Sequence, residues 1–324
     1  MRTMRTVTEL RAALAPVRQA ALVRPTHAGA AVSDVATTIG LVPTMGALHE
    51  GHLSLIRCAR EQCDFVVVSL FVNPAQFDEG ADLEFYPRRE ADDARLAEQA
   101  GTDILFAPSI EEVYPDGFSS AVEVFGLTDR FEGASRGASH FRGVTTVVTK
   151  LLNMVSPDLA YFGQKDAQQV AVIKRMVADL NMPVDIEVCD TTRERDGLAM
   201  SSRNARLDPD QRIRAGALFE ALEQAADLAY AGEHSAEKLV PAARETLTAR
   251  GVEPEYLELV DPLTFERVDS LSATALLILA ARVGAVRLID NVMLTPASVH
   301  AMSTPVAGDS TISHLSTGAS TCSA

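Results

Sequence analysis

The sequence predicts an α/β protein in which a doubly wound, Rossmann-like parallel sheet domain is followed by a second, smaller α+β domain. Apolar runs of strand length alternate with segments of helical periodicity through the first 190 residues, as they do in βαβ units. After residue 190 the alternation stops, and two amphipathic helices precede a group of strand-like runs. We therefore expect domains over residues 1–190 and 191–302, and a disordered tail over 303–324, where ten residues are Ser or Thr.

The first domain is expected to begin with a short helix from Thr8 to about Arg18. The run over 65–72 is apolar except for Ser69, as a strand buried on both faces would be. Apolar residues between positions 48 and 63 recur at helical spacing. The expected strands are 39–43, 65–72, 103–107, 159–162 and 184–188, and the remaining expected helices are 88–100, 144–155 and 166–180.

The second domain is joined to the first through an arginine-bearing hinge over Thr191–Arg206. Asp208 and Pro209 mark a helix start, because Asp is a good N-cap and proline suits the first helical position. A second helix is expected from about Ala236 to Arg250, ending at Gly251. Strands are expected over 256–260, 274–281 and 285–289.

The composition excludes several classes of protein. The 324 residues include 29 Lys and Arg against 44 Asp and Glu, a formal net charge of −15, which argues against nucleic acid as a partner. The longest apolar stretch, 273–281, is much shorter than the roughly 20 residues of a membrane span. The N-terminal segment lacks the apolar core of a secretory signal, and the four cysteines form no metal or disulfide pattern. We therefore expect a cytoplasmic protein with no membrane partner.

Polar clusters follow four of the predicted strands at the point where each strand ends. They cover Met45–His52, Asn73–Phe77, Gly163–Asp166 and Arg193–Arg206. Ligands of open parallel sheets bind in the crevice outside the carboxyl ends of the strands. This edge of the sheet is therefore the candidate active site.

The first cluster contains two histidines, His49 and His52, at the opening of a helix. Their spacing lets both imidazoles point the same way, and a helix N-terminus favours phosphate and disfavours imidazolium. Gly46 and Gly51 would let the backbone approach a nucleotide closely. A bare HxGH could equally be two histidines on a helix face, but the longer string PTMGALHEGH (43–52) resembles the signature of the HxGH nucleotidyltransferase superfamily, whose members attack the α-phosphate of a nucleotide.

The third and fourth clusters offer partners for a polyphosphate. Lys165 precedes a helix that we expect Asp166 to cap, and a cation there is favourable when an anion lies beside it. Ser201, Ser202 and Arg203 supply two hydroxyls and a guanidinium on a loop of net charge +2. Taken singly, Lys165 could be a surface lysine and the loop an ordinary linker.

Other residues suit a small hydroxy acid or a metal ion. The amides of Gln76 and Gln169 both donate and accept hydrogen bonds, which fits hydroxyl and carboxylate groups. Valines at 144, 147 and 148 could form an apolar wall, although core packing explains them equally well. Asp92 and Asp93 are candidates for Mg²⁺ bound by way of phosphate and water, the alternative being that at least one is only solvated.

Five strings together resemble the pantothenate synthetase family, whose members are also called pantoate–β-alanine ligases. The strings are PTMGALHEGH (43–52), FVNPAQF (71–77), HFRGVTTVV (140–148), YFGQKDAQQ (161–169) and DGLAMSSRN (196–204), within a match from about Val7 to Leu294. The resemblance implies that ATP activates pantoate as a pantoyl adenylate with release of diphosphate, in the presence of Mg²⁺. The amine of β-alanine then displaces AMP to give pantothenate. The same resemblance implies that the protein is a homodimer.

The resemblance also implies roles for individual residues. The implied catalytic residues are His52, as the proton-donating histidine, together with His49, Lys165 and Arg203. The implied ATP contacts are Met45, Gly46, His49, Gly51, His52, Gly163, Gln164, Lys165, Asp166, Thr192, Met200, Ser201, Ser202 and Arg203. The implied pantoate contacts are Asn73, Gln76, Val147, Val148 and Gln169, and Gln76 also contacts β-alanine. The tail and an alanine-rich stretch at 27–37 lie outside the family pattern, and Ala167 stands where an aromatic residue is common.

Three alternatives remain open from the sequence. A cytidylyl- or adenylyltransferase of the same superfamily would keep the nucleotide in its product. A class I aminoacyl-tRNA synthetase shares the histidine signature but needs a basic surface for tRNA, which the composition opposes. A regulatory module that binds nucleotide without catalysis is opposed by the presence of every candidate catalytic side chain.

Overall fold

The computed structural model describes residues 1–22, 37–77 and 88–296. The predicted tail, and the stretch at 27–37 except for Thr37, lie outside the described residues. Within the described segments, no helix has both the length and the apolarity to cross a bilayer.

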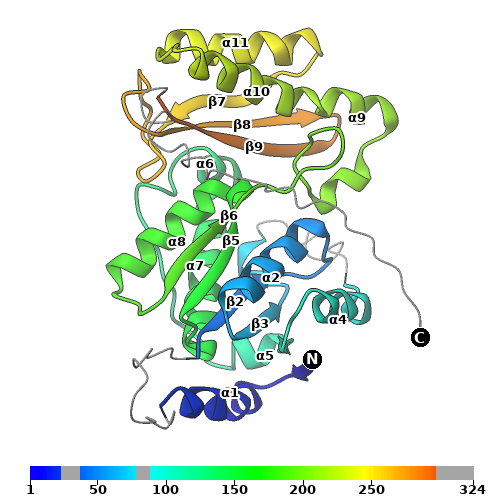
Figure 1. Cartoon of the computed structure of the whole chain (residues 1–324), viewed down its shortest axis with the longest axis vertical. Helices are drawn as coiled ribbons and strands as arrows, with labels where there is room; N and C mark the ends of the chain where they lie inside the picture. Colours follow the sequence, from blue (N-terminus) through cyan, green and yellow to red (C-terminus); the bar gives the residue numbers. More distant parts are fainter. Residues whose placement is uncertain (23–36, 78–87, 297–324) are drawn as a thin grey trace, which may run out of the picture.

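A six-stranded parallel sheet forms the larger part of the protein (Figure 1). Its order is β1 (Arg2–Met4), β4 (Ile104–Phe106), β3 (Phe65–Leu70), β2 (Ile39–Thr44), β5 (Leu159–Gly163) and β6 (Asp185–Cys189). The chain builds outward from β2 to β3 and β4, and then returns to place β5 on the other side of β2. This reversal makes the carboxyl ends of β2 and β5 the topological switch point of the sheet, where ligands bind in doubly wound folds. The predicted fold class is therefore confirmed.

Helices cover both faces of this sheet. They are α1 (Val7–Leu22), α2 (Glu50–Gln62), α4 (Glu90–Gln99), α5 (Ile110–Val113), α6 (Glu132–Arg136), α7 (Ala138–Val155) and α8 (Ala167–Asp179). In β3, Val67 packs with α1, α7 and α8, whereas Val66 and Val68 pack with α2 and α4. Alternation of side chains along a strand explains why this run is apolar on both faces.

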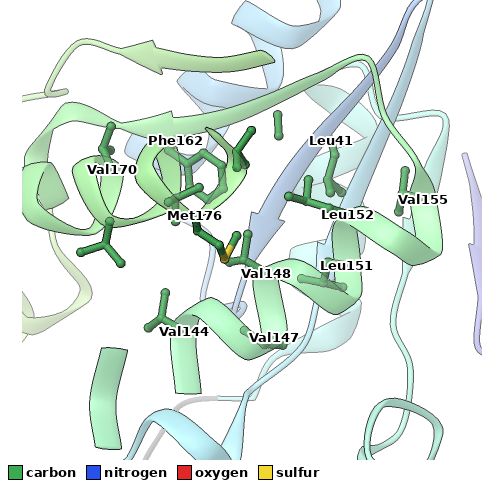
Figure 2. Packing of buried hydrophobic residues seen from close by; sticks show 14 of the residues in the cluster. Leu41, Val144, Val147, Val148, Leu151, Leu152, Val155, Phe162, Val170 and Met176 are labelled. Carbon is green, nitrogen blue, oxygen red and sulfur yellow. The ribbon is translucent and has the colours of Figure 1, made fainter. Parts of the chain in front are cut away.

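Helix α7 contributes many apolar side chains to the core on one face of the parallel sheet. Figure 2 shows its apolar side chains, among them Val144, Val148 and Leu152, beside Leu41 of β2 and Met176 of α8. The helix begins six residues earlier than the predicted 144–155, directly after Gly137, whose φ of 88° suits glycine.

The smaller part has an antiparallel sheet in the order β7 (Pro254–Val260), β8 (Ala275–Val283) and β9 (Val286–Leu294). Its helices are α9 (Pro209–Ala215), α10 (Ala217–Tyr230) and α11 (Ala236–Ala249). Figure 1 shows this sheet between α10 and α11 on one side and the larger part on the other. In β8, Leu277 and Leu279 pack into the core with these helices, whereas Leu276 and Ile278 join the core of the parallel sheet.

Most predicted elements are present, with local differences. The predicted helix start at Asp208 is confirmed by a capping box in which Asp208 accepts from the backbone N–H of Gln211 and Gln211 reaches back to the N–H of Asp208. The amphipathic stretch that follows is divided at Gly216 into α9 and α10. Gly251, at φ 65°, ends α11 as expected. The edge strand β1 was not predicted, and it pairs with β4.

Candidate active site

The four polar clusters meet around one cavity at the carboxyl ends of β2, β3, β5 and β6. Its volume is about 290 Å³, close to the lower end of the range for small-molecule pockets. Of the predicted site residues, those that line it are Met45, His49, Gly51, His52, Asn73, Gln76, Val147, Val148, Gly163, Lys165, Asp166, Gln169, Thr192, Met200, Ser201, Ser202 and Arg203. Gly46, Gln164, Asp92 and Asp93 do not line it.

The two histidines are held by reciprocal hydrogen bonds at the start of α2. His49 is the N-cap, and its Nδ1 accepts from the backbone N–H of Gly51 at 3.2 Å. Nδ1 of His52 accepts from the backbone N–H of His49 at 3.4 Å. The ring centroids are 4.1 Å apart. In a neutral imidazole whose Nδ1 accepts, the proton is on Nε2. Both rings therefore keep an Nε2–H donor for the cavity.

The surroundings of the histidines keep both rings neutral. Burial lowers the pKa of His52 to about 3, with further contributions from the nearby charges of His49 and Lys165. Burial and then the charge of Lys165 also lower the pKa of His49. The site therefore presents two uncharged donors beside the ammonium group of Lys165.

Gln76 is positioned by a short helical turn, Pro74–Gln76, that packs against α7. Asn73, which is 1% exposed, caps this turn by accepting from the backbone N–H of Ala75. Its amide nitrogen donates to Oε1 of Gln76 at 3.0 Å and to the carbonyl of Gly143 at 3.1 Å. A Cβ at Gly143 would lie 2.2 Å from the carbonyl oxygen of Ala75, so this close approach needs glycine. Asn73 therefore serves to position Gln76 as well as lining the cavity.

The Gly163–Asp166 cluster is fixed by the smaller part of the protein. Asn291 of β9 donates from its amide nitrogen to the carbonyls of Gln164 and Lys165, both at 3.0 Å, and accepts from Nε2 of Gln164 at 2.9 Å. Gln164 therefore links the turn after β5 to β9 and is not among the residues that line the cavity. Within the described part of the chain, Lys165 makes no ion pair.

The prediction that Asp166 caps the following helix is wrong in its chemistry. Asp166 occupies the N-cap position of α8, but its side chain accepts no hydrogen bond from the helix. Its φ of −96° and ψ of 52° lie outside the extended region that an N-cap residue usually adopts. The carboxylate lines the cavity instead.

The hinge brings one of its four arginines to the cavity. Arg193 forms a bidentate ion pair with Asp290, at 2.6 and 3.1 Å, and stacks over the ring of Phe219. Arg203 lines the cavity with the two serines, and the Ser201 hydroxyl accepts from the backbone N–H of Arg203. The hydroxyls of Ser54 and Thr192, 2.9 Å apart, tie the start of the hinge to α2. Part of the positive charge of the loop is therefore paired within the protein, at Arg193 and Asp290, and does not face the cavity.

Sequence reasoning missed several residues of the cavity that come from distant parts of the chain. Glu132 is 7% exposed and accepts from Arg136, Arg287 and Tyr256. Burial alone would raise the pKa of Glu132, but the hydrogen bonds and charges of Arg287 and Arg136 lower it to about 2. Arg136 also lines a small adjoining hollow with Lys165 and Arg203. Tyr256 and Arg287 lie 124 and 155 residues from Glu132, so the sequence shows only the i,i+4 pair of Glu132 and Arg136.

Asp92 and Asp93 do not fit a magnesium site at this cavity. Both Asp93 oxygens accept backbone N–H groups, from Ala47 at 3.0 Å and from Leu48 at 2.7 Å. Asp92 lies on the exposed side of α4, where it pairs with Arg95 at 3.5 Å. Among the residues that the structure describes, no group of three or more His, Cys, Asp or Glu could hold a metal ion.

Comparison with known proteins identifies relatives over nearly the whole chain. The family model described as pantoate-beta-alanine ligase matches residues 2–293. A pantothenate synthetase from Heliobacterium modesticaldum is 54% identical over 258 residues, which is 79% of this chain and 92% of that protein. Pantothenate synthetase 1 from Bradyrhizobium diazoefficiens is 51% identical over 91% of this chain and 99% of that protein.

Solved structures show the same similarity. The pantothenate synthetase of Thermus thermophilus superposes with a TM-score of 0.81 at 45% identity, covering 91% of this chain and all of that one. A pantoate-beta-alanine ligase from Francisella tularensis, complexed with beta-gamma ATP and beta-alanine, gives a TM-score of 0.69 at 32% identity. That match covers 90% of this chain and 97% of the other.

Proposed function

Because the chain belongs to the pantoate–β-alanine ligase family, we propose that the cavity at the β2–β5 switch point holds ATP and pantoate side by side and carries out both steps of the family's reaction. The protein is an ATP-dependent ligase that condenses (R)-pantoate with β-alanine and forms a C–N bond. The observation that carries the residue assignments is the meeting of two Nε2–H donors, Lys165, Arg203 and two glutamines around one cavity.

In the first step, a pantoate carboxylate oxygen forms a bond to the α-phosphorus of ATP, and the bond from that phosphorus to the bridging oxygen of the β-phosphate breaks. Diphosphate leaves with the electron pair. Charge grows on the phosphoryl oxygens, and positioned donors stabilise it without covalent chemistry. We assign this role to His49 and His52 through Nε2–H, and to Lys165 and Arg203 as cations.

The neutral state of His52 defines when it can give up a proton. Its pKa of about 3 in the free protein makes it a hydrogen-bond donor at neutral pH. A bound triphosphate favours the imidazolium, since an anion nearby raises the pKa of a histidine. Proton donation by His52, to an oxygen of the departing diphosphate, is then restricted to the nucleotide-bound enzyme.

Pantoate is assigned to the side of the cavity lined by α7 and the turn at Pro74–Gln76. The amides of Gln76 and Gln169 orient its hydroxyl and carboxylate groups, and Val147 and Val148 contact its methyl groups. Asn73 acts mainly by holding Gln76. In the second step the β-alanine amine, near Gln76, bonds to the activated carbonyl carbon, and the bond from that carbon to the AMP oxygen breaks. AMP leaves with the electron pair, and the proton lost by the amine passes to the AMP phosphate or to water.

The smaller domain, which we assign to 191–302 with the larger one over 1–190, completes the site. It contributes Tyr256, Asp290 and Asn291 to the cavity and the hinge residues Met200–Arg203 that contact the phosphates. The remaining ATP contacts are assigned to Met45, Gly51, Gly163, Asp166 and Thr192. Covering the cavity in this way protects the adenylate from hydrolysis.

Mg²⁺, a homodimer and a cytoplasmic location complete the proposal. Mg²⁺ enters with ATP, held by phosphate oxygens and water, as is usual for this ion. The family resemblance implies the homodimer, which light scattering after size exclusion tests. A reaction that consumes ATP fits the cytoplasm, which cell fractionation tests.

Product analysis tests the function. Incubation with ATP, pantoate and β-alanine should release AMP and diphosphate in equal amounts with pantothenate, and omission of β-alanine should stop turnover after the adenylate forms. A product that retains the nucleotide would identify a cytidylyl- or adenylyltransferase acting on another small substrate.

A further inference from the structure

The turn between β2 and α2 has an unusual backbone. Gly46 and Ala47 both have positive φ, 88° and 51°. The left-handed region suits glycine but is disfavoured for alanine. His49, the N-cap of α2, follows only two residues later, so the path of this turn fixes where both imidazoles lie.

One buried carboxylate holds this turn from outside it. Asp93 lies in the first turn of α4 and is 3% exposed. Its Oδ2 accepts from the backbone N–H of Ala47 at 3.0 Å, and its Oδ1 accepts from the backbone N–H of Leu48 at 2.7 Å. A Cβ at Gly46 would lie 3.0 Å from Oδ2, so glycine also gives the carboxylate room.

We propose that Asp93 is a positioning residue for the reaction: its carboxylate fixes the left-handed Gly46–Ala47 turn, and the turn fixes the two histidines that face the phosphates. This inference rests on the roles proposed above for His49 and His52. It differs from a metal-binding role, because both oxygens already accept backbone N–H groups and neither lines the cavity.

The main test is Asp93→Asn, which keeps the shape of the side chain but places an NH₂ against a backbone N–H. The turn then shifts, and we expect kcat for adenylate formation to fall about 10²-fold, since a displacement of about 1 Å at a reacting centre has an effect of this size. The Mg²⁺ concentration for half-maximal activity should not change.

Asp158→Asn is the matched control. Asp158 accepts from the backbone N–H of Ile39 at 2.8 Å, at the other end of the same strand β2. A single oxygen of Asp158 accepts this bond, and the amide oxygen of asparagine can take its place, so the bond is weakened without the turn of the chain being displaced and kcat should stay near that of the wild type. An equal loss of kcat in the two variants would overturn the proposal, because any weakening of β2 would then suffice.

A rescue variant separates positioning from other roles. Ala47→Gly removes the cost of the left-handed φ, so adding it to Asp93→Asn should raise kcat at least about fivefold. If Asp93→Asn alone folds poorly, the double variant is the protein on which kcat is measured. No rescue, with a several-fold higher Mg²⁺ requirement and recovery at high Mg²⁺, would instead identify a metal ligand. A lower melting temperature with normal kcat would reduce Asp93 to a stabilising residue.

Wild-type turnover separates the two proposals. If the wild-type protein forms no adenylate, the proposed function fails. If the wild type is active and Asp93→Asn is equally active, only the positioning role of Asp93 fails.

Discussion

Glu132 and Arg287 form a bidentate ion pair, at 2.9 and 2.7 Å, although 155 residues separate them in the sequence. Glu132 belongs to α6 beside the parallel sheet, and Arg287 belongs to β9 of the antiparallel sheet. Tyr256 donates to the same carboxylate at 2.9 Å, and Arg136 at 2.8 Å. One buried acid therefore links elements of both sheets at the edge of the cavity.

Glu132→Gln should lower the free energy of unfolding by about 3 kcal/mol at neutral pH, because it removes the buried charge that pairs with two half-buried arginines. The folded-state pKa of Glu132, about 2, lies below its ordinary value of 4.5. Stability from this group is therefore present above pH 4.5 and is lost as the pH falls toward 2.

Urea unfolding at several pH values measures this difference. Glu253→Gln, which removes the exposed pair with Arg244, is the control and should change stability by at most about 1 kcal/mol. A difference between wild type and Glu132→Gln that stays constant down to pH 3 would contradict the assignment.

His52 should remain neutral, with its proton on Nε2, from pH 8 down to pH 5, because burial and the charges of His49 and Lys165 lower its pKa to about 3. Nitrogen NMR of histidine-labelled protein, assigned with His52→Asn, reports both the tautomer and the titration. A midpoint near the ordinary value of 6.5 would contradict this picture of the site.

Lys165→Met should reduce kcat about 10²- to 10³-fold, the usual effect of removing one group that stabilises transition-state charge. It should also raise the pKa of His49 and His52, since Lys165 lowers both. Lys174→Met, an exposed lysine of α8, is the control. Unchanged histidine titration together with normal turnover would remove Lys165 from the site.

Gly143→Ala should raise KM for pantoate more than KM for ATP. The added Cβ would lie 2.2 Å from the carbonyl oxygen of Ala75 and would displace the turn that carries Gln76. A displacement of this kind can lower the reaction rate about 10²-fold. In Gly216→Ala the nearest atom is 3.4 Å away, so this control should stay active. Steady-state kinetics with each substrate varied will separate the two effects, and an unchanged KM for pantoate in Gly143→Ala would place Gln76 elsewhere.

The fold was largely predictable because local patterns determine it. Strands such as 65–70 are buried on both faces, and capping residues such as Asp208 act within one turn. The edge strand β1 was not predictable in this way, since three residues that include an exposed arginine carry no strand pattern without their partner β4.

The site was predictable as far as its residues follow strand ends. Residues such as His52, Gln76 and Lys165 do so, and the structure brings them to one cavity. Glu132 and Asn291 act through partners far away in the sequence. Asp93 is a residue whose type suggested a metal, whereas its two backbone contacts become visible only in three dimensions.

Exchange of labelled diphosphate into ATP is the most direct test of a shared ATP and pantoate cavity, because adenylate formation is reversible. With wild-type protein the exchange should require pantoate, should not require β-alanine, and should fall by orders of magnitude in His52→Ala. Exchange that proceeds equally well without pantoate, or in His52→Ala, would contradict the account.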